Sequence, residues 1–212
     1  MEISLANIGK RYNREWIFRG IDGTYRIGDS IAILGANGSG KSTLLQVFSG
    51  YLTPSEGSIQ WHDEGKRIGV DKIFREVALA TPYMTNYDEF TLQENIQFFL
   101  SFKSFRNGIS TKEAAELMGL SKHLNKQLKH YSSGMKQRVK LGLAILSDAK
   151  ILLLDEPSSH LDVNAIAWYQ DLLRKNSQGR IIFVASNKEE AETIGCNQKI
   201  NIEDFKRLDV QV

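Results

Sequence analysis

The chain contains a single cysteine, Cys196, among its 212 residues. Neither an internal disulfide nor a cysteine-bound metal cluster can form, which fits a reducing compartment. Only three prolines are present and no segment is of low complexity, so a linker to a second independent domain is not expected. We therefore predict one domain over residues 1–212.

Long apolar runs are also missing. No segment approaches the length needed to cross a bilayer, and the opening MEISLANIGK lacks the basic and apolar parts of an export signal. The expected location is the cytoplasm. If the protein acts at a membrane, it must dock there.

An excess of one charge is missing as well. Lysine and arginine total 27 against 25 aspartates and glutamates, so there is no broad basic field and nucleic acid is not an expected partner. Apolar residues, in contrast, make up 42% of the chain, which is enough for a substantial core.

The distribution of these apolar residues predicts an α/β fold. Strands are favoured at residues 3–8, 30–34, 77–80, 151–154 and 181–185. The segments 30–34, 151–154 and 181–185 are apolar at nearly every position, as expected for parallel strands buried on both faces. Helical spacing is found at residues 41–48, 92–102, 111–118, 134–146 and 163–174.

The segment from about residue 84 to residue 131 shows helical patterns and polar turns but no convincing strand. We interpret it as a helical subdomain inserted into the α/β core. Four phenylalanines, Phe98, Phe99, Phe102 and Phe105, follow helical spacing within it, and we expect most of them to form the core of the subdomain.

A glycine-rich loop joins the strand expected at 30–34 to the helix expected at 41–48. Its sequence, Gly35-Ala36-Asn37-Gly38-Ser39-Gly40-Lys41-Ser42, matches the phosphate-loop pattern in the required strand-to-helix context. Glycines let successive N–H groups converge on phosphate oxygens, and the helix N-terminus adds the positive end of its dipole. The pattern therefore predicts a site for nucleotide phosphates.

Within this loop, Lys41 is expected to reach the β- and γ-phosphates of ATP and the Ser42 hydroxyl to bind Mg²⁺. Thr43 completes the predicted ATP-binding set. The alternative is a glycine-rich turn that merely enters an ordinary helix. The flanking strand and helix favour the nucleotide site.

Two adjacent carboxylates, Asp155 and Glu156, end the apolar strand Ile151-Leu152-Leu153-Leu154. Side chains on a strand alternate between faces, so the two can serve different purposes. Asp155 suits the coordination shell of Mg²⁺, and Glu156 suits polarising the attacking water as a general base. A pair of solvated acids is the alternative, and the phosphate loop upstream favours the catalytic interpretation.

The segment Tyr131-Ser132-Ser133-Gly134-Met135 lies just before the helix expected at 134–146. Both serines and the Gly134 N–H can donate to an anion at a helix N-terminus, although simple capping by serine would explain them in isolation. In its order and spacing relative to the phosphate loop and the LLLDEP strand, this segment resembles the signature of the ABC ATPase family. The resemblance covers nearly the whole chain.

The resemblance implies a fold and a way of working. The fold is a P-loop NTPase of ABC ATPase type, with a mainly parallel sheet core, an N-terminal antiparallel β part and a helical subdomain. It also implies that ATP joins two copies head to tail, each phosphate loop facing Ser132, Ser133 and Gly134 of the other copy, and that hydrolysis separates them. The implied partner is a separate transmembrane permease, with the chain peripheral on the cytoplasmic face of the cell membrane.

Further segments agree with the family. The stretch from Ser158 to Asp162 resembles the loop that crosses the dimer interface, and His160 within it reads as an interface or surface residue rather than a metal ligand. Tyr12 stands where an aromatic ring usually stacks on adenine, although it could instead be a partly buried packing residue. Many family members carry glutamine at the position of Met135. The signature form YSSGM resembles that of exporters whose ATPase and membrane subunits are separate chains.

The chain departs from the family pattern at two places. Tyr83 stands where a glutamine is expected, and Ser186 or Asn187 stands where a histidine contacts the γ-phosphate. Both losses bear on hydrolysis more than on binding, so one hypothesis is slow turnover in isolation. The other is ordinary turnover with these roles moved elsewhere. Tyr83, with Met84 and Tyr87, is also a candidate for docking on the permease.

Three functions are consistent with the sequence, and the ATPase subunit of a transporter leads. A soluble ABC-type ATPase of DNA repair or translation is the alternative, but the coiled-coil insertions or paired ATPase domains of such proteins are not seen. A catalytically weak, nucleotide-dependent interaction module is the third. A small-molecule P-loop kinase would not explain YSSGM placed before LLLDEP.

Overall fold

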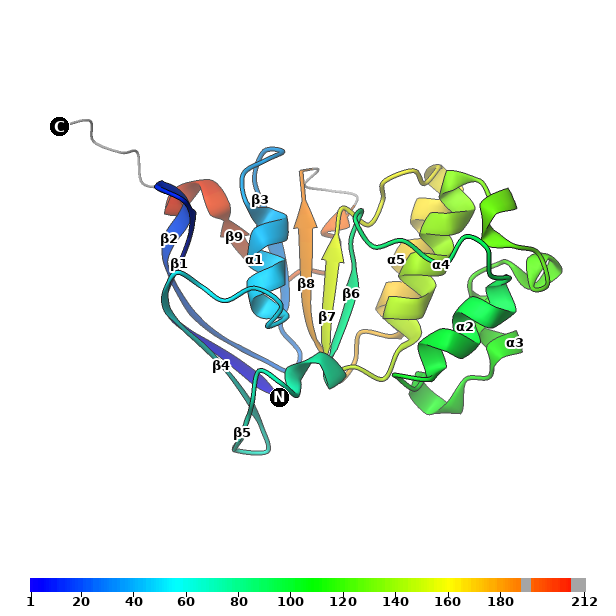
Figure 1. Cartoon of the computed structure of the whole chain (residues 1–212), viewed down its shortest axis with the longest axis horizontal. Helices are drawn as coiled ribbons and strands as arrows, with labels where there is room; N and C mark the ends of the chain where they lie inside the picture. Colours follow the sequence, from blue (N-terminus) through cyan, green and yellow to red (C-terminus); the bar gives the residue numbers. More distant parts are fainter. Residues whose placement is uncertain (188–191, 207–212) are drawn as a thin grey trace.

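The computed structural model describes residues 1–187 and 192–206 of the chain, and a parallel sheet of five strands lies at its centre (Figure 1). The strand order is β6-β7-β8-β3-β9. The strands are β3 (Ser30–Leu34), β6 (Val77–Ala80), β7 (Ile151–Asp155), β8 (Ile181–Ser186) and β9 (Gln198–Asn201). The first four were predicted to within a residue. β9 was not, because three of its four side chains are exposed and leave little apolar pattern.

The second sheet is antiparallel and has the order β2-β1-β4-β5. Its strands are β1 (Glu2–Tyr12), β2 (Glu15–Arg26), β4 (Glu56–Asp63) and β5 (Lys66–Ile68). Of these, only residues 3–8 were bounded from the sequence. β4 buries a single side chain, Trp61, so it carries almost no alternation for a pattern to detect.

The parallel sheet is buried on both faces because alternate side chains of each strand point to opposite sides. In β7, Leu152 and Leu154 pack with the helices, while Ile151 and Leu153 pack toward the antiparallel sheet. Burying each of these side chains contributes about 1.5–3 kcal/mol. The helix α1 (Lys41–Phe48) lies between the two sheets, as Figure 1 shows.

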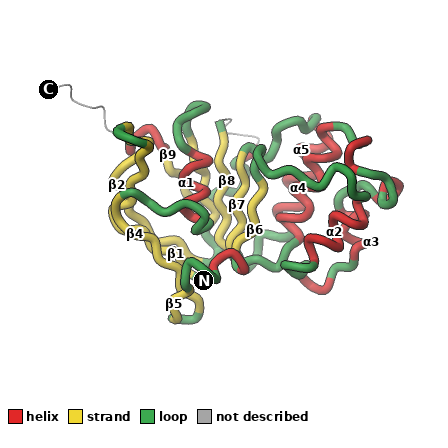
Figure 2. Tube along the Cα trace, in the orientation of Figure 1, coloured by secondary structure: helices red, strands yellow, loops and turns green. Residues whose placement is uncertain are grey.

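The remaining helices gather beyond the β6 edge of the parallel sheet (Figure 2). They are α2 (Leu92–Leu100), α3 (Thr111–Leu117), α4 (Ser133–Leu146) and α5 (Val163–Lys175). Capping boxes begin α2 and α3, with Thr91 paired to Glu94 and Ser110 paired to Glu113. Residues 84–131, all of which are described, contain helices, short turns and no strand.

The phenylalanines of this region divide into two groups. Phe105 is buried and Phe99 packs partly against the core, whereas Phe98 and Phe102 are 39% and 67% exposed. The prediction that most of them form a core was therefore wrong for two of the four. The buried positions of α2 are Leu92, Asn95 and Ile96. Helical spacing places Phe99 on the same face of the helix, and Phe98 and Phe102 outside it.

Among the helices of the described residues, none combines the length and the apolar character that crossing a membrane requires.

Candidate functional site

The phosphate loop connects the carboxyl end of β3 to the N-terminus of α1. Lys41 is 4% exposed, and its Nζ donates to the carbonyl oxygens of Gly35, at 2.9 Å, and Ala36, at 3.0 Å. These bonds fold the lysine back along the loop, so its charge lies where the loop's N–H groups converge. An anion in the loop would meet both.

Glycine is required at Gly40, the residue that precedes α1. Its φ of 107° lies in the left-handed region, and a Cβ there would come within 2.3 Å of Ile17 Cγ2. Gly38 also has a positive φ, 77°, but faces open space. The pattern of glycines in this loop is thus explained by backbone conformation and, at Gly35 and Gly40, by close packing as well.

A cavity of about 400 Å³ lies over the loop and brings several predicted residues together. The loop contributes Asn37, Gly38, Gly40, Lys41, Ser42 and Thr43, and the end of β7 contributes Asp155 and Glu156. Ile17, Pro82 and Tyr83 complete its lining. Tyr83 therefore lies at the site. Ile17 and Pro82 were not anticipated, since neither carries a chemical signal in the sequence.

Asp155 is 2% exposed at the end of β7. Burial raises the pKa of its carboxyl, while a hydrogen bond from Ser42 and the charge of Lys41 act in the opposite direction. Its Oδ2 has no hydrogen-bond partner among residues 1–187 and 192–206. An unpartnered buried carboxylate oxygen beside a serine hydroxyl fits the oxygen ligands that Mg²⁺ prefers.

Glu156 follows Asp155 but takes a different conformation. Its φ of 46° is uncommon for a residue other than glycine, and such strain is concentrated at functional sites. Its N–H donates to the carbonyl of Ala185 in β8 at 2.9 Å, which anchors the turn. The two carboxylates thus lie in different environments, Asp155 buried and Glu156 half-buried; because β7 ends at Asp155, the left-handed turn at Glu156, and not strand alternation, separates them.

Asn187 and Ser186 occupy different environments at the end of β8. The Asn187 Nδ2 donates to Asn37 Oδ1 of the phosphate loop at 2.7 Å. Ser186 is fully buried and donates instead to Glu192. Of the two residues, Asn187 is thus the one that contacts the phosphate loop.

Tyr12 does not line the 400 Å³ cavity. It lies near the end of β1, where its side chain is 48% exposed and Lys10 Nζ stands 5.4 Å from the ring centroid. This exposure argues against the alternative that Tyr12 is a partly buried packing residue. About half of the side chain remains accessible, with Lys10 over the ring.

The signature residues line a separate cavity, of about 360 Å³, together with His160 and Asp162. Ser132 caps α4, its Oγ accepting from the Met135 N–H at 3.2 Å. Ser132 and Gly134 are both part of this second lining, and Ser133 is the first residue of α4. Within one copy of the chain, the signature and the phosphate loop thus form two distinct sites.

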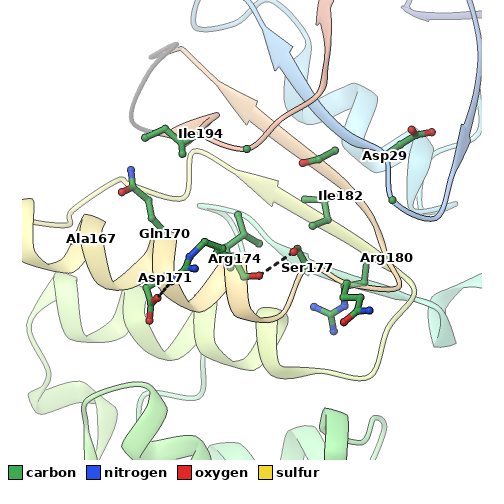
Figure 3. A pocket seen from close by; sticks show the side chains of 14 residues that line it. Asp29, Ala167, Gln170, Asp171, Arg174, Ser177, Arg180, Ile182 and Ile194 are labelled. Carbon is green, nitrogen blue, oxygen red and sulfur yellow. Dashed lines mark hydrogen bonds and ion pairs between the residues drawn. The ribbon is translucent and has the colours of Figure 1, made fainter.

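A larger cavity, of about 550 Å³, opens at the opposite ends of the parallel strands, near Ser30 and Ile182 (Figure 3). Arg174 is paired with Asp171 in its lining, whereas Arg180 takes part in no ion pair among the described residues. The Arg180 guanidinium donates to the carbonyl of Ile145 at 2.7 Å, and burial lowers its pKa to about 9. Ligands of α/β sheets bind at the carboxyl ends of the strands, so the smaller cavity is the candidate site.

Comparison with known proteins identifies the family. Residues 18–159 match the family model described as ABC transporter, which covers well over half of the chain. The chain belongs to the ABC transporter family. The matched range contains the phosphate loop, the signature and the two carboxylates, so the resemblance inferred from these motifs is confirmed.

Named relatives of this ABC protein include ATP-binding subunits. The spermidine/putrescine import ATP-binding protein PotA of Mycoplasma capricolum is 30% identical over 208 residues, which are 93% of this chain and 57% of PotA. The uncharacterized ABC transporter ATP-binding protein YybJ of Bacillus subtilis is 30% identical over 191 residues, 89% of this chain and 86% of YybJ. The chain thus spans little more than half the length of PotA.

Solved structures of similar fold are ABC cassettes. A putative ABC transporter ATP-binding protein from Pyrococcus furiosus has a TM-score of 0.79 at 20% sequence identity. The match covers 98% of this chain and 100% of the Pyrococcus chain. The cassette MJ0796, as a dimer in a post-hydrolysis state bound to ADP and Pi, has a TM-score of 0.80 at 20% identity over 94% of each chain. These matches confirm the ABC ATPase fold.

Proposed function

We propose that this chain is the ATP-binding and ATP-hydrolysing subunit of an ABC transporter and powers transport through a separate membrane permease. The observation that carries the proposal is the 400 Å³ cavity, whose walls include Lys41, Ser42, Asp155 and Glu156. A cation, a hydroxyl and two carboxylates at the carboxyl edge of a parallel sheet are the groups that phosphoryl transfer to water requires. The chain forms one ABC ATPase domain, residues 1–212, with 84–131 as an inserted helical subdomain.

Each residue of the site has a defined task in this reaction. The N–H groups from Gly35 to Thr43 bind phosphate oxygens, and Lys41 binds the β- and γ-phosphates of ATP. Glu156 accepts a proton from the water that attacks the γ-phosphate. Tyr12 stacks on adenine, and its exposed side chain supports that role.

Mg²⁺ is held by Ser42 and Asp155. The unpartnered Oδ2 of Asp155 and the contact of this carboxylate with Ser42 support the assignment. When bound, the ion neutralises negative charge that develops on the phosphate oxygens.

Two copies act together, head to tail. The phosphate loop and the signature line different cavities of one chain, so Ser132, Ser133 and Gly134 are free to contact ATP held by another copy. The dimeric state of the structural neighbour MJ0796 supports a homodimer here.

The permease docks on the exposed loop that follows β6, and the chain is peripheral on the cytoplasmic face of the membrane. Tyr83, Met84 and Tyr87 are 79%, 46% and 52% exposed. Tyr87 stacks on Phe90 with ring centroids 5.1 Å apart and meets Phe98 edge-on at 4.8 Å. Solvent-exposed aromatic groups of this size mark interaction surfaces.

Two experiments test the proposal. The first measures the phosphate that the purified chain releases from Mg·ATP, and we expect EDTA to abolish this release. The absence of both ATP binding and phosphate release contradicts the assignment.

Affinity purification of a tagged chain from solubilised membranes tests the partner. We expect one integral membrane protein in stoichiometric amount, whereas purification from the soluble fraction alone with full ATPase activity favours a soluble ABC-type ATPase.

A further inference from the structure

Glu192 is 3% exposed, and its carboxylate accepts hydrogen bonds from two separate segments of the chain. Its Oε1 accepts from the Ser158 N–H, at 2.9 Å, and from the Ser158 hydroxyl. Its Oε2 accepts from the Ser186 hydroxyl. Within the described part of the chain Glu192 takes part in no ion pair, so these neutral donors alone stabilise the buried carboxylate.

Burying a carboxylate without a cation is costly unless its oxygens are well hydrogen-bonded, which ties both serines firmly to Glu192. Ser186 is the last residue of β8 and precedes Asn187, which bonds to Asn37 of the phosphate loop. Ser158 lies two residues after Glu156. One carboxylate therefore fixes the chain segments that leave β7 and β8 on either side of the candidate site.

The segment 157–162 also contacts α4, which begins within the signature and is called the signature helix below. Gln137 of α4 is buried, and its Nε2 donates to the carbonyl of Pro157 at 3.0 Å. The carbonyl of His160 packs so closely against Gly134 that a Cβ there would come within 3.0 Å of it. The signature helix is thus connected through Pro157 and Ser158 to Glu192.

We propose that Glu192 is a positioning residue for ATP hydrolysis. It couples the segment 157–162, and through it the signature helix, to Asn187 and the phosphate loop. This inference rests on the proposed function: when two copies close on ATP, Glu192 transmits the position of the signature helix to the group beside the γ-phosphate. Glu192 does not line the 400 Å³ cavity, and it acts through Ser158 and Ser186.

The test compares Glu192→Ala with Glu192→Gln. Glutamine keeps an acceptor for the Ser158 N–H, and its amide can donate to the Ser186 oxygen, so the link survives without the charge. We expect Glu192→Ala to lower kcat about tenfold or more, since small misplacements near the chemistry have effects of that size. Its Kd for ATP and its KM stay within twofold, and Glu192→Gln recovers most of kcat.

The serines and a buried tyrosine supply the remaining variants. Ser158→Ala and Ser186→Ala each lower kcat less than Glu192→Ala, and the double serine variant, which keeps the bond from the Ser158 N–H, lowers it more than either single variant. Tyr169→Phe is the matched control, because its hydroxyl approaches only the backbone carbonyl of Glu192, at 3.5 Å. We expect its kcat to be unchanged.

Several outcomes overturn the proposal. A wild-type kcat in Glu192→Ala does so, as does an equal loss in the Ala and Gln variants, which would assign the effect to charge. A fall in kcat that tracks the melting temperature across all variants, Tyr169→Phe included, shows that Glu192 serves the fold alone. Absence of Lys41-dependent hydrolysis in the wild type is a separate result, which contradicts the proposed function itself.

Discussion

At the scale of single residues, the phosphate site depends on a lysine that is nearly fully buried. Lys41 brings the only charge of the loop Gly35–Ser42 toward the phosphates, and charge-assisted bonds contribute about 1.5–3 kcal/mol each. We expect Lys41→Ala to weaken Mg·ATP binding more than tenfold, as measured by calorimetry. Lys66→Ala, which removes an exposed lysine of β5, is the control. Unchanged affinity in a folded Lys41→Ala variant contradicts the phosphate-loop assignment.

Asn187 offers a test of the missing histidine. Its amide donates a neutral hydrogen bond, and it cannot become cationic as imidazole can. We hypothesise that the chain hydrolyses ATP slowly and that Asn187→His raises kcat, by up to about a hundredfold (about 3 kcal/mol) if the ring acts like a single oxyanion donor.

Ser186→His is the control for this substitution, because Ser186 is fully buried and bonded to Glu192 and should not tolerate an imidazole. Ordinary turnover in the unmodified chain, with no gain from Asn187→His, shows that another residue has taken over the role.

The residues that could be found from the sequence are those whose chemistry is contiguous. Gly35–Ser42 and Asp155-Glu156 each form an unbroken motif. Asn187, in contrast, meets Asn37 across 150 residues, and Glu192 meets Ser158 across 34. Neither pairing leaves a local pattern. The sequence therefore pointed to position 186 or 187 through the family pattern alone, and it gave no sign of Glu192.

At the scale of the elements, strands buried on both faces were predictable and half-exposed ones were not. Every residue of β8 is buried, so its apolar run is continuous. β4, which has Trp61 as its one buried residue, and the short β5 gave no such signal. Their existence depends on pairing, of β4 with β1 and of β5 with β4, which is a property of the sheet and not of either segment alone.

The contact between α3 and α4 leads to a stability prediction. A Cβ at Gly142 in α4 would lie 2.4 Å from Met118 Cγ, and Met118 is fully buried. We expect Gly142→Ala to lower the free energy of unfolding by about 1–3 kcal/mol, although alanine has a higher helix propensity than glycine. Urea denaturation of this variant, of Met118→Ala and of the double variant measures the coupling. The double variant should lose less than the sum, and strict additivity contradicts the close contact.

The loop after β6 can be tested separately from ATP binding. Because Tyr83 also lines the phosphate cavity, Met84→Ser with Tyr87→Ser is the sharper variant, and Tyr83→Ser can be added afterwards. We expect weaker association with membranes and unchanged affinity for ATP, measured by flotation and calorimetry. Tyr51→Ser, at an exposed tyrosine after α1, is the control. Equal loss of membrane and ATP binding indicates a folding defect.

At the scale of the whole molecule, one chain carries two helix N-termini suited to anions, at α1 and α4, in separate cavities. In the proposed head-to-tail dimer the unlike ends of two copies meet. Glu156, the proposed general base, would then decide how long the pair persists. Glutamine at this position cannot accept the proton of water, so Glu156→Gln should bind ATP with wild-type affinity and release less than about a hundredth of the phosphate.

Light scattering of the Glu156→Gln variant in saturating Mg·ATP tests the central claim most directly. If two copies close on ATP and Glu156 starts the hydrolysis that separates them, the variant should shift from the monomer mass to twice that mass. Removing ATP or chelating Mg²⁺ should reverse the shift. A variant that binds Mg·ATP with wild-type affinity but keeps the monomer mass would contradict the account.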